Sequence, residues 1–265
     1  MSEIRKITSR SNEEIKKIRS LAQRKYREES GLFITEGLRH ALEAAEAGWE
    51  FQSLVIEDGS KGHDLVKKLL KQADCLVLEV PSAIMESITK RDNAQNVVAV
   101  LKQQWTDLAS VKDGLWITLE EIRDPGNLGT IMRTADCVGA RGIVLIGNTC
   151  DPYSLEAIRA SMGSFPHMKM VRCELDEFAA WAGKSRFQIV GTHLMTDHDY
   201  RAVKYKTPLM LLMGNEQAGL TDQLVKICTD LVKIPMKGKA DSLNVSVATA
   251  VMLYEINRAE LKIAD

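Results

Sequence analysis

Three stretches of the chain carry the side-chain types from which a binding or catalytic site is usually built: residues 124–140, 214–220 and 234–258. Each follows or includes an apolar run expected to be a buried strand, and each places polar residues directly after it. Such connections on a rigid scaffold are where binding groups concentrate. The candidate groups are amides, a guanidinium, a carboxylate and a hydroxyl, carried by Asn127, Arg133, Asn215, Glu216, Ser242 and Asn244.

The first stretch reads D-P-G-N-L-G-T-I-M-R-T-A-D-C-V-G-A and predicts a helix that begins at Asp124-Pro125. Aspartate is favoured as a helix cap, and proline is tolerated in the first turn. Apolar residues at helical spacing predict one buried stripe, made of Leu128, Ile131, Met132, Ala135 and Val138. Arg133 lies off this stripe, so its guanidinium can project from a rigid element. Taken alone, the pattern also fits an ordinary capped helix with a solvated arginine.

The second stretch, G-N-E-Q-A-G-L, follows the apolar run 208–213. Ligands of open α/β sheets gather at the carboxyl ends of strands, where Gly214 would let a ligand approach the backbone. Glu216 could orient a nearby amide or guanidinium, and a turn with a solvated glutamate is the alternative. The chain has no G-x-G-x-x-G dinucleotide fingerprint and no Walker phosphate loop, since Gly238-Lys239 lacks the upstream glycine spacing.

The third stretch begins in a short apolar run that Pro235 ends, because proline has no N–H to donate to a strand ladder. Ser242 and Asn244 then precede a predicted helix with the apolar stripe Val245, Ala248, Val251, Met252, Ile256 and Ala259. Serine and asparagine are favoured at helix starts. These two residues are therefore either caps alone or caps that also face a ligand.

The surrounding elements alternate between strand and helix patterns along the chain. In the second half, apolar runs near residues 115–119, 142–146, 168–171, 187–192, 209–213 and 231–234 predict strands. Alternation of this kind predicts an α/β fold with a parallel sheet and helices on both faces. The first half predicts a smaller α/β unit, with strands near residues 54–56, 75–78 and 97–100 and a helix near 64–72. We expect domains at residues 1–103 and 114–265, joined by a polar linker at 104–113.

The 265 residues carry a net charge of −1, so any nucleic-acid surface must be a local patch. A predicted helix from Ser11 buries Ile15, Ile18, Leu21 and Ala22. Its other faces hold a basic group that could contact RNA phosphates or simply be solvated: Lys16, Arg19, Arg24, Lys25 and Arg27. No apolar run reaches the ~20 residues of a membrane span, and the N-terminus is charged, so we expect a cytoplasmic protein.

Metal and nucleophile chemistry is not predicted. The five scattered cysteines form no C-x-x-C, and we expect isolated buried thiols in a reducing compartment. The five histidines match no ligand or nucleophile spacing either: His40, His63, His167, His193 and His198. Of these, His193 follows a predicted strand and is the one of interest.

Together, N-L-G-x-x-x-R-T-A-D, G-N-E-x-x-G-L and S-L-N-V-S-V-A resemble, in content and order, the motifs of the SpoU (TrmH-type) branch of the SPOUT methyltransferases. The resemblance implies a C-terminal domain with a deep trefoil knot and an N-terminal domain related to ribosomal protein L30e. It also implies a homodimer that methylates a ribose 2′-hydroxyl of ribosomal or transfer RNA from S-adenosylmethionine, without a metal. The catalytic residues implied are Asn127, Arg133, Glu216, Ser242 and Asn244, and the cofactor-binding residues are Gly214, Asn215, Ile234, Met236 and Leu243.

Two other functions remain open on the sequence. One is a SPOUT methyltransferase that acts on an RNA base, and the other is a non-catalytic RNA-binding protein with the same fold. The intact motif residues weigh against the second alternative. The first half matches the family more loosely, since Ala94-Gln95-Asn96 stands where the family often has Pro-Gln-Gly.

Overall fold

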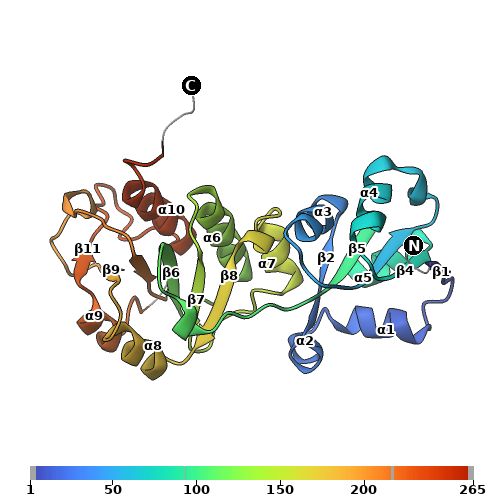
Figure 1. The fold of residues 1–265 in the computed structure, drawn as a ribbon. Helices are drawn as coiled ribbons and strands as arrows, with labels where there is room; N and C mark the ends of the chain where they lie inside the picture. Colours follow the sequence, from blue (N-terminus) through green and yellow to red (C-terminus); the bar gives the residue numbers. More distant parts are fainter. Residues whose placement is uncertain (1–3, 93, 216–217, 262–265) are drawn as a thin grey trace. The chain divides into compact units, whose positions relative to one another are not determined.

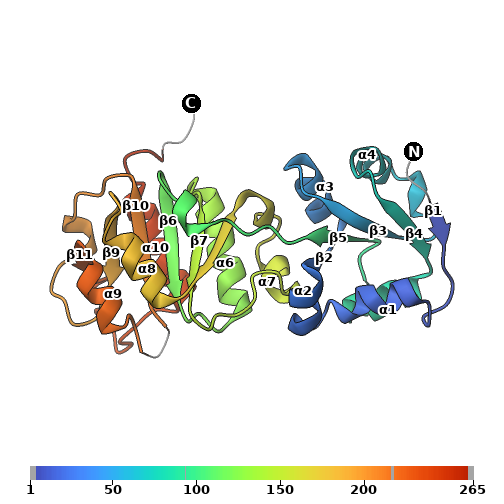
Figure 2. The ribbon, with the colours of Figure 1, turned by 60° about the horizontal axis from the view of Figure 1, so that its bottom comes forward.

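The computed structural model describes residues 4–92, 94–215 and 218–261. They form two compact units (Figure 1 and Figure 2). The first unit comprises the described residues within Met1–Gln103 together with Asp151–Pro166, and the second those within Gln104–Cys150 and His167–Asp265. The first unit therefore includes a segment from the second half of the chain.

The second unit is built around a six-stranded sheet whose neighbouring strands are parallel. The order is β11-β9-β10-β6-β7-β8, made of β6 (Leu115–Glu120), β7 (Gly142–Ile146), β8 (Lys169–Cys173), β9 (Gln188–Thr192), β10 (Leu209–Met213) and β11 (Asp230–Val232). Helices α6 (Pro125–Cys137) and α10 (Val245–Ile256) lie on one face, and α8 (Leu175–Ala182) and α9 (Asp222–Ile227) on the other (Figure 1). The predicted α/β fold is confirmed, while the knot stays a prediction from the resemblance.

Alternate strand residues form the core beneath α8 and α9, because side chains of a strand point to opposite faces in turn. Phe178 and Leu224, both fully buried, pack there against strand residues that include Trp116, Val144, Val171, Met210 and Leu212. Leu108 and Val111 join the same core, so the expected linker 104–113 is packed onto the second unit and contains the short 3₁₀ helix η2 (Leu108–Ser110).

The first unit has a five-stranded mixed sheet in the order β1-β4-β3-β5-β2. Its strands are β1 (Ile4–Lys6), β2 (Leu32–Glu36), β3 (Phe51–Glu57), β4 (Leu76–Val80) and β5 (Val97–Lys102), with β5 antiparallel to β2 and β3. Its helices are α1 (Glu13–Ser20), α2 (Arg24–Ser30), α3 (Leu38–Glu46), α4 (Asp64–Gln72), α5 (Ser82–Thr89) and α7 (Leu155–Ala160). The single basic helix expected from Ser11 is two helices, and its cap is Asn12, whose Oδ1 accepts from the Glu14 N–H at 2.9 Å.

Residues 151–166 are held in the first unit by charge and by aromatic packing. The buried Arg27 guanidinium donates to Asp151 Oδ2 at 2.7 Å, and Arg159 pairs with the buried Glu36. Phe165 packs edge-on against Phe33, with ring centroids 5.7 Å apart. A segment fastened by two ion pairs and an aromatic contact belongs to the core of the unit.

All five cysteines are free. Four are buried or half-buried, as expected, but Cys137 is exposed because it lies off the buried stripe of α6. Burial raises the pKa of the Cys173 and Cys228 thiols to about 12, so neither is a thiolate nucleophile near neutral pH. In the described part of the chain, no helix has the length and apolar character needed to cross a membrane.

Candidate active site

A cavity of about 410 Å³ lies where the chain leaves β9, β10 and β11 and enters α10. We call it the strand-end cavity. Its walls come from three connections that are far apart in the sequence, and its volume is in the range of small-molecule sites. Six of the predicted catalytic and cofactor-binding residues line it: Gly214, Asn215, Ile234, Met236, Ser242 and Leu243. The structure therefore brings the five expected cofactor-binding residues together, and their binding role stays a prediction.

Gly214 is required at the end of β10 because the chain folds back on itself there. A Cβ at this position would lie 2.1 Å from the carbonyl carbon of Gly219 and 2.3 Å from the Leu220 nitrogen. Asn215 and Gly219 close the loop with reciprocal backbone hydrogen bonds of 3.1 and 2.9 Å. Asn215 Nδ2 also donates to the Glu121 carbonyl at 3.1 Å, which ties the loop to the end of β6.

Part of the cavity wall is apolar although it faces solvent. Leu194, Met195 and Leu243 line the cavity with exposed fractions of 55, 86 and 38 %. Large apolar side chains at the mouth of a cavity are suited to covering the flat face of an organic ring, and methionine adapts readily to such surfaces. Leu194 and Met195 were not identified from the sequence. The sequence feature that could have identified them is their position directly after a predicted strand, next to His193.

Two predicted catalytic amides meet between the starts of α6 and α10. Asn244 Nδ2 donates to Asn127 Oδ1 at 3.0 Å, across 117 positions of sequence. Asp124 Oδ1 accepts from the Asn127 N–H at 2.6 Å and caps α6, and Asn244 Oδ1 accepts from the Ser246 N–H at 2.9 Å and caps α10. The amide contact therefore fixes the two helix starts relative to each other next to the strand-end cavity.

Arg133 is exposed on α6, as its place off the buried stripe predicts. It lies six residues beyond Asn127, about 9 Å along the helix at 1.5 Å per residue. It is not among the described residues that line the strand-end cavity. Within one chain, the structure thus does not join Arg133 to the other predicted site residues. Ser242 is exposed and its hydroxyl bonds to Asp241 Oδ1 at 3.1 Å, whereas Glu216 lies outside the described residues.

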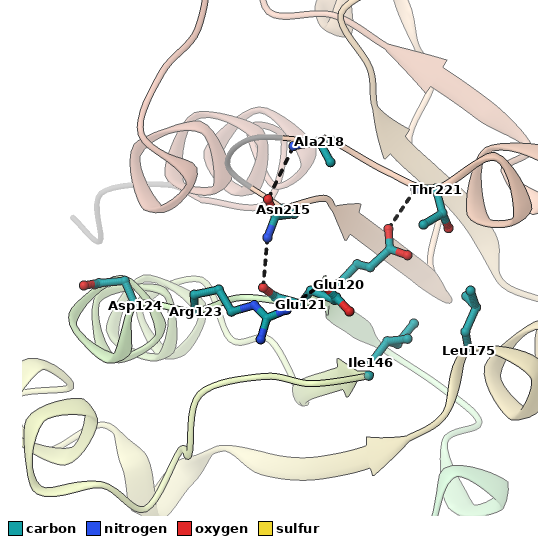
Figure 3. A pocket seen from close by; sticks show the side chains of 11 residues that line it. Glu120, Glu121, Arg123, Asp124, Ile146, Leu175, Asn215, Ala218 and Thr221 are labelled. Carbon is teal, nitrogen blue, oxygen red and sulfur yellow. Dashed lines mark hydrogen bonds and ion pairs between the residues drawn. The ribbon is translucent and has the colours of Figure 1, made fainter.

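A second cavity, of about 580 Å³, lies at the carboxyl ends of β6 and β7. We call it the acidic cavity, since it is lined by the side chains of Glu120, Glu121, Asp124 and one guanidinium, Arg123 (Figure 3). Of its lining, the motif stretches identified from the sequence include Asp124, Asn215, Ala218 and Gly219. The run E-E-I-R-D after an apolar strand was the signal available for the rest.

The basic residues of α1 and α2 differ in their availability for RNA. Arg27 is 3 % exposed and occupied by Asp151 and the Leu21 carbonyl, so burial removes it from the predicted RNA-contacting set. The remaining four are exposed and each has a partner close in sequence: Lys16 with Glu13, Arg24 with Glu28, Lys25 with Glu29, and Arg19 with the Arg10 carbonyl. Exposed pairs of this kind are weak and exchange readily with other ligands.

Among the described residues, no group of three or more His, Cys, Asp or Glu side chains is arranged to hold a metal ion. The predicted candidate His193 lines the strand-end cavity, where its Nδ1 accepts from the Met195 N–H at 3.3 Å. It acts there as a backbone anchor for the apolar rim.

Comparison with known families matches both units of the chain. Residues 114–254 match the SpoU rRNA Methylase family, and residues 12–99 match the MRM3-like substrate binding domain. The first match covers more than half of the chain, including the three motif stretches up to residue 254.

Individual relatives match over nearly the whole length. A 23S rRNA (uridine(2479)-2′-O)-methyltransferase of Streptomyces viridochromogenes is 31% identical over 97% of this chain and 93% of its own. The 23S rRNA (guanosine(2553)-2′-O)-methyltransferase RlmP of Bacillus subtilis is 28% identical, covering 96% and 99%. The AdoMet-bound rRNA methyltransferase of Sinorhizobium meliloti is 41% identical with a TM-score of 0.91, covering 98% of this chain and 99% of that one.

Proposed function

The chain belongs to the SpoU rRNA methylase family, and we infer that it transfers a methyl group from S-adenosylmethionine to a ribose 2′-hydroxyl of RNA, with ribosomal RNA as the substrate. The observation that carries this inference is that the motif stretches 214–220 and 234–258 converge on the strand-end cavity, while the first motif joins them through the contact between Asn127 and Asn244. The two relatives described above are named for different nucleotides, a uridine and a guanosine, so the family does not determine the target base.

The residues that line the strand-end cavity fit the methyl donor. We propose that backbone groups of Gly214, Ile234 and Leu243 hold its adenine, with apolar side chains of the rim against the ring. S-adenosylmethionine supplies a methyl group on a sulfonium, which is an excellent leaving group. The protein then has mainly to hold the ribose oxygen in line with the methyl group and the sulfur. Asn127 and Asn244, fixed at the two helix starts, are proposed to orient the ribose.

The remaining chemical task is to ease loss of the proton from the 2′-hydroxyl. A guanidinium keeps its proton in proteins, so Arg133 suits an electrostatic role better than that of a base. We propose that it clamps the adjacent phosphate and stabilises negative charge that develops on the oxygen. Because Arg133 lies on the exposed side of α6, we propose that it acts at the strand-end cavity of a second copy of the chain.

A homodimer would provide that second copy. α10 packs against α6 and still exposes apolar side chains, with Val247 47 % and Tyr254 53 % exposed. Covering this surface with the same surface of another copy would bury it and place α6 at the interface. Val247→Glu should make the protein monomeric by sedimentation and lower methyl transfer. Leu65→Glu, at a leucine of α4 that is 47 % exposed, should leave both unchanged.

The first unit is proposed to bind the RNA substrate, with Lys16, Arg19, Arg24 and Lys25 as phosphate contacts. Its match to a substrate binding domain and the exposure of these side chains support this role. A cytoplasmic location, where ribosomal RNA is accessible, is part of the same proposal.

Two measurements test the proposed function. Calorimetry should detect binding of S-adenosylmethionine by the purified protein, and Gly214→Ala should weaken this binding. Mapping of ribose methylation in RNA from cells with and without the gene should reveal one 2′-O-methyl group that disappears with the protein. Lack of donor binding, or an unchanged ribose-methylation map, would refute the assignment.

A further inference from the structure

The acidic cavity borders the strand-end cavity and has no role in the function proposed so far. Asn215, Ala218 and Gly219 line both cavities, so the connection after β10 forms a shared wall. The acidic cavity has a volume of about 580 Å³, which is enough for a small organic ligand or one unit of a polymer.

A chain of hydrogen bonds links a residue of the acidic cavity to the edge of the strand-end cavity. It runs from Asp124, which lines the acidic cavity, through the Asn127 backbone N–H and side chain to Asn244. Asn244 is adjacent to Leu243, which lines the strand-end cavity. A ribose oriented by Asn127 and Asn244 would therefore have the acidic cavity on one side and the methyl donor on the other.

The charges of the acidic cavity exclude a phosphate. Glu120, Glu121 and Asp124 contribute three carboxylates, and Arg123, which pairs with Glu121 at 2.8 Å, contributes one guanidinium. The excess of negative charge favours a ligand group that donates hydrogen bonds and carries no negative charge. The phosphates of a bound RNA would be repelled from this space and would have to remain outside it.

Glu120 is the residue best placed to accept hydrogen bonds from such a ligand. It is 4 % exposed, and one carboxylate oxygen accepts from the Thr221 N–H at 2.9 Å. No other hydrogen bond to this carboxylate comes from the described residues. Figure 3 shows the carboxylate reaching toward Thr221, and the apolar residues Ile146 and Leu175 line the same cavity. In such a cavity, a buried acceptor can accept hydrogen bonds from the edge of a flat ring, while the apolar side chains pack against the face of the ring.

We propose that the acidic cavity receives the base of the nucleotide whose ribose is methylated and selects guanine over uracil. This inference rests on the proposed function. Guanine presents two adjacent donors, N1–H and N2–H, which a carboxylate can accept together. Uracil flanks its one N–H with two carbonyl oxygens, which a carboxylate repels. Glu120 would thus be a specificity-determining residue for the reaction.

The first experiment uses the full chain saturated with S-adenosylhomocysteine and follows the methyl NMR signals of Ile146 and Leu175 during titration with guanosine or uridine. We expect guanosine to shift these signals with a Kd at least about fivefold lower than that of uridine, the lower end of what a bidentate base contact contributes. Glu120→Gln should bring the ratio close to one, because the amide keeps an acceptor for Thr221 but offers a donor to uracil. Glu177→Gln, on the exposed surface of α8, is the matched control and should keep the ratio.

The proposal would be overturned by equal affinities for guanosine and uridine, by methyl signals of Ile146 and Leu175 that do not shift, or by an affinity ratio that is unchanged in Glu120→Gln.

The second experiment uses the ribose-methylation map. If the methylated nucleotide is a guanosine, we replace it with uridine in the RNA substrate and measure kcat/KM. A decrease of at least about fivefold, the size expected for loss of a bidentate contact, supports the proposal. A methylated uridine overturns the base assignment while the proposed function stands, whereas a protein that binds no donor and modifies no RNA refutes the function itself.

Discussion

Asn127 and Asn244 show how one side chain can have a structural and a chemical role together. Each lies at the start of a helix, where an amide or hydroxyl side chain is favoured, so capping alone explains the residue type at position 244. Capping does not explain the 3.0 Å contact between the two amides. The contact places both groups at the point where two connections meet, and the two roles can be separated by substitution.

Asn244→Ser retains a capping hydroxyl for α10 but is too short to reach Asn127. We expect its free energy of unfolding to stay within about 0.5 kcal/mol of that of the unsubstituted protein. We expect kcat/KM for methyl transfer to fall about fivefold to tenfold, because this fold change corresponds to the free energy of one hydrogen bond. Asn244→Ala should lose the same activity and also about 0.5–2 kcal/mol of stability. Urea unfolding and methyl-incorporation assays measure the two effects. Unchanged activity in Asn244→Ser would make Asn244 a cap only.

Arg133 provides a second test at this scale. Its side chain is exposed and off the buried stripe, so Arg133→Lys should change stability by less than about 0.5 kcal/mol. Lysine keeps the charge but loses the planar fork that holds a phosphate, so we expect kcat to fall roughly 10²-fold or more. Donor binding by calorimetry should be unchanged. Near-normal turnover in this variant would exclude both a clamping and a proton-accepting role.

At the scale of elements, the end of β10 decides whether the strand-end cavity can form. The fold-back between Gly214 and Gly219 leaves no room for a side chain at position 214, since the nearest atoms belong to the backbone. The Asn215 bond to the Glu121 carbonyl then joins this loop to the end of β6. One glycine therefore affects both cavities.

Gly214→Ala should force the loop apart and weaken donor binding at least about tenfold, with a loss of roughly 1–3 kcal/mol in stability from the clash. Gly62→Ala is the control, because a Cβ there meets no atom within 4 Å and its backbone needs no glycine. Calorimetry with S-adenosylmethionine and thermal unfolding report the two quantities. If Gly214→Ala bound the donor as tightly as Gly62→Ala, the close approach would have no part in binding.

At the scale of the whole molecule, the chain is not divided into two continuous halves. Residues 151–166 belong to the first unit, and the buried Arg27–Asp151 pair joins positions 124 residues apart. A buried ion pair adds little to stability over apolar residues of the same shape, yet loss of one partner is costly because the other charge remains buried. This asymmetry predicts how the first unit responds to substitution.

Arg27→Met should destabilise the first unit by about 3–5 kcal/mol, since the Asp151 carboxylate stays buried without its partner. Adding Asp151→Asn removes that charge and keeps an acceptor for the Tyr153 N–H, so the double variant should recover a large part of the loss. Arg24→Met, on the exposed Arg24–Glu28 pair, should cost less than about 0.5 kcal/mol. Urea unfolding of the three variants provides the comparison. A double variant no more stable than Arg27→Met would contradict the charge explanation.

The amino-acid sequence by itself determined the order of strands and helices in the second unit, because apolar spacing reports which face of each element is buried. Through the resemblance of its motifs it also predicted that Gly214, Ile234 and Leu243 lie together, and all three line the strand-end cavity. Only the tertiary structure decided that Arg27 is buried and that residues 151–166 join the first unit. It alone revealed the acidic cavity around Glu120. The physical reason is that these features depend on pairs far apart in the chain, and local spacing carries no information about which distant charge or loop a side chain will meet.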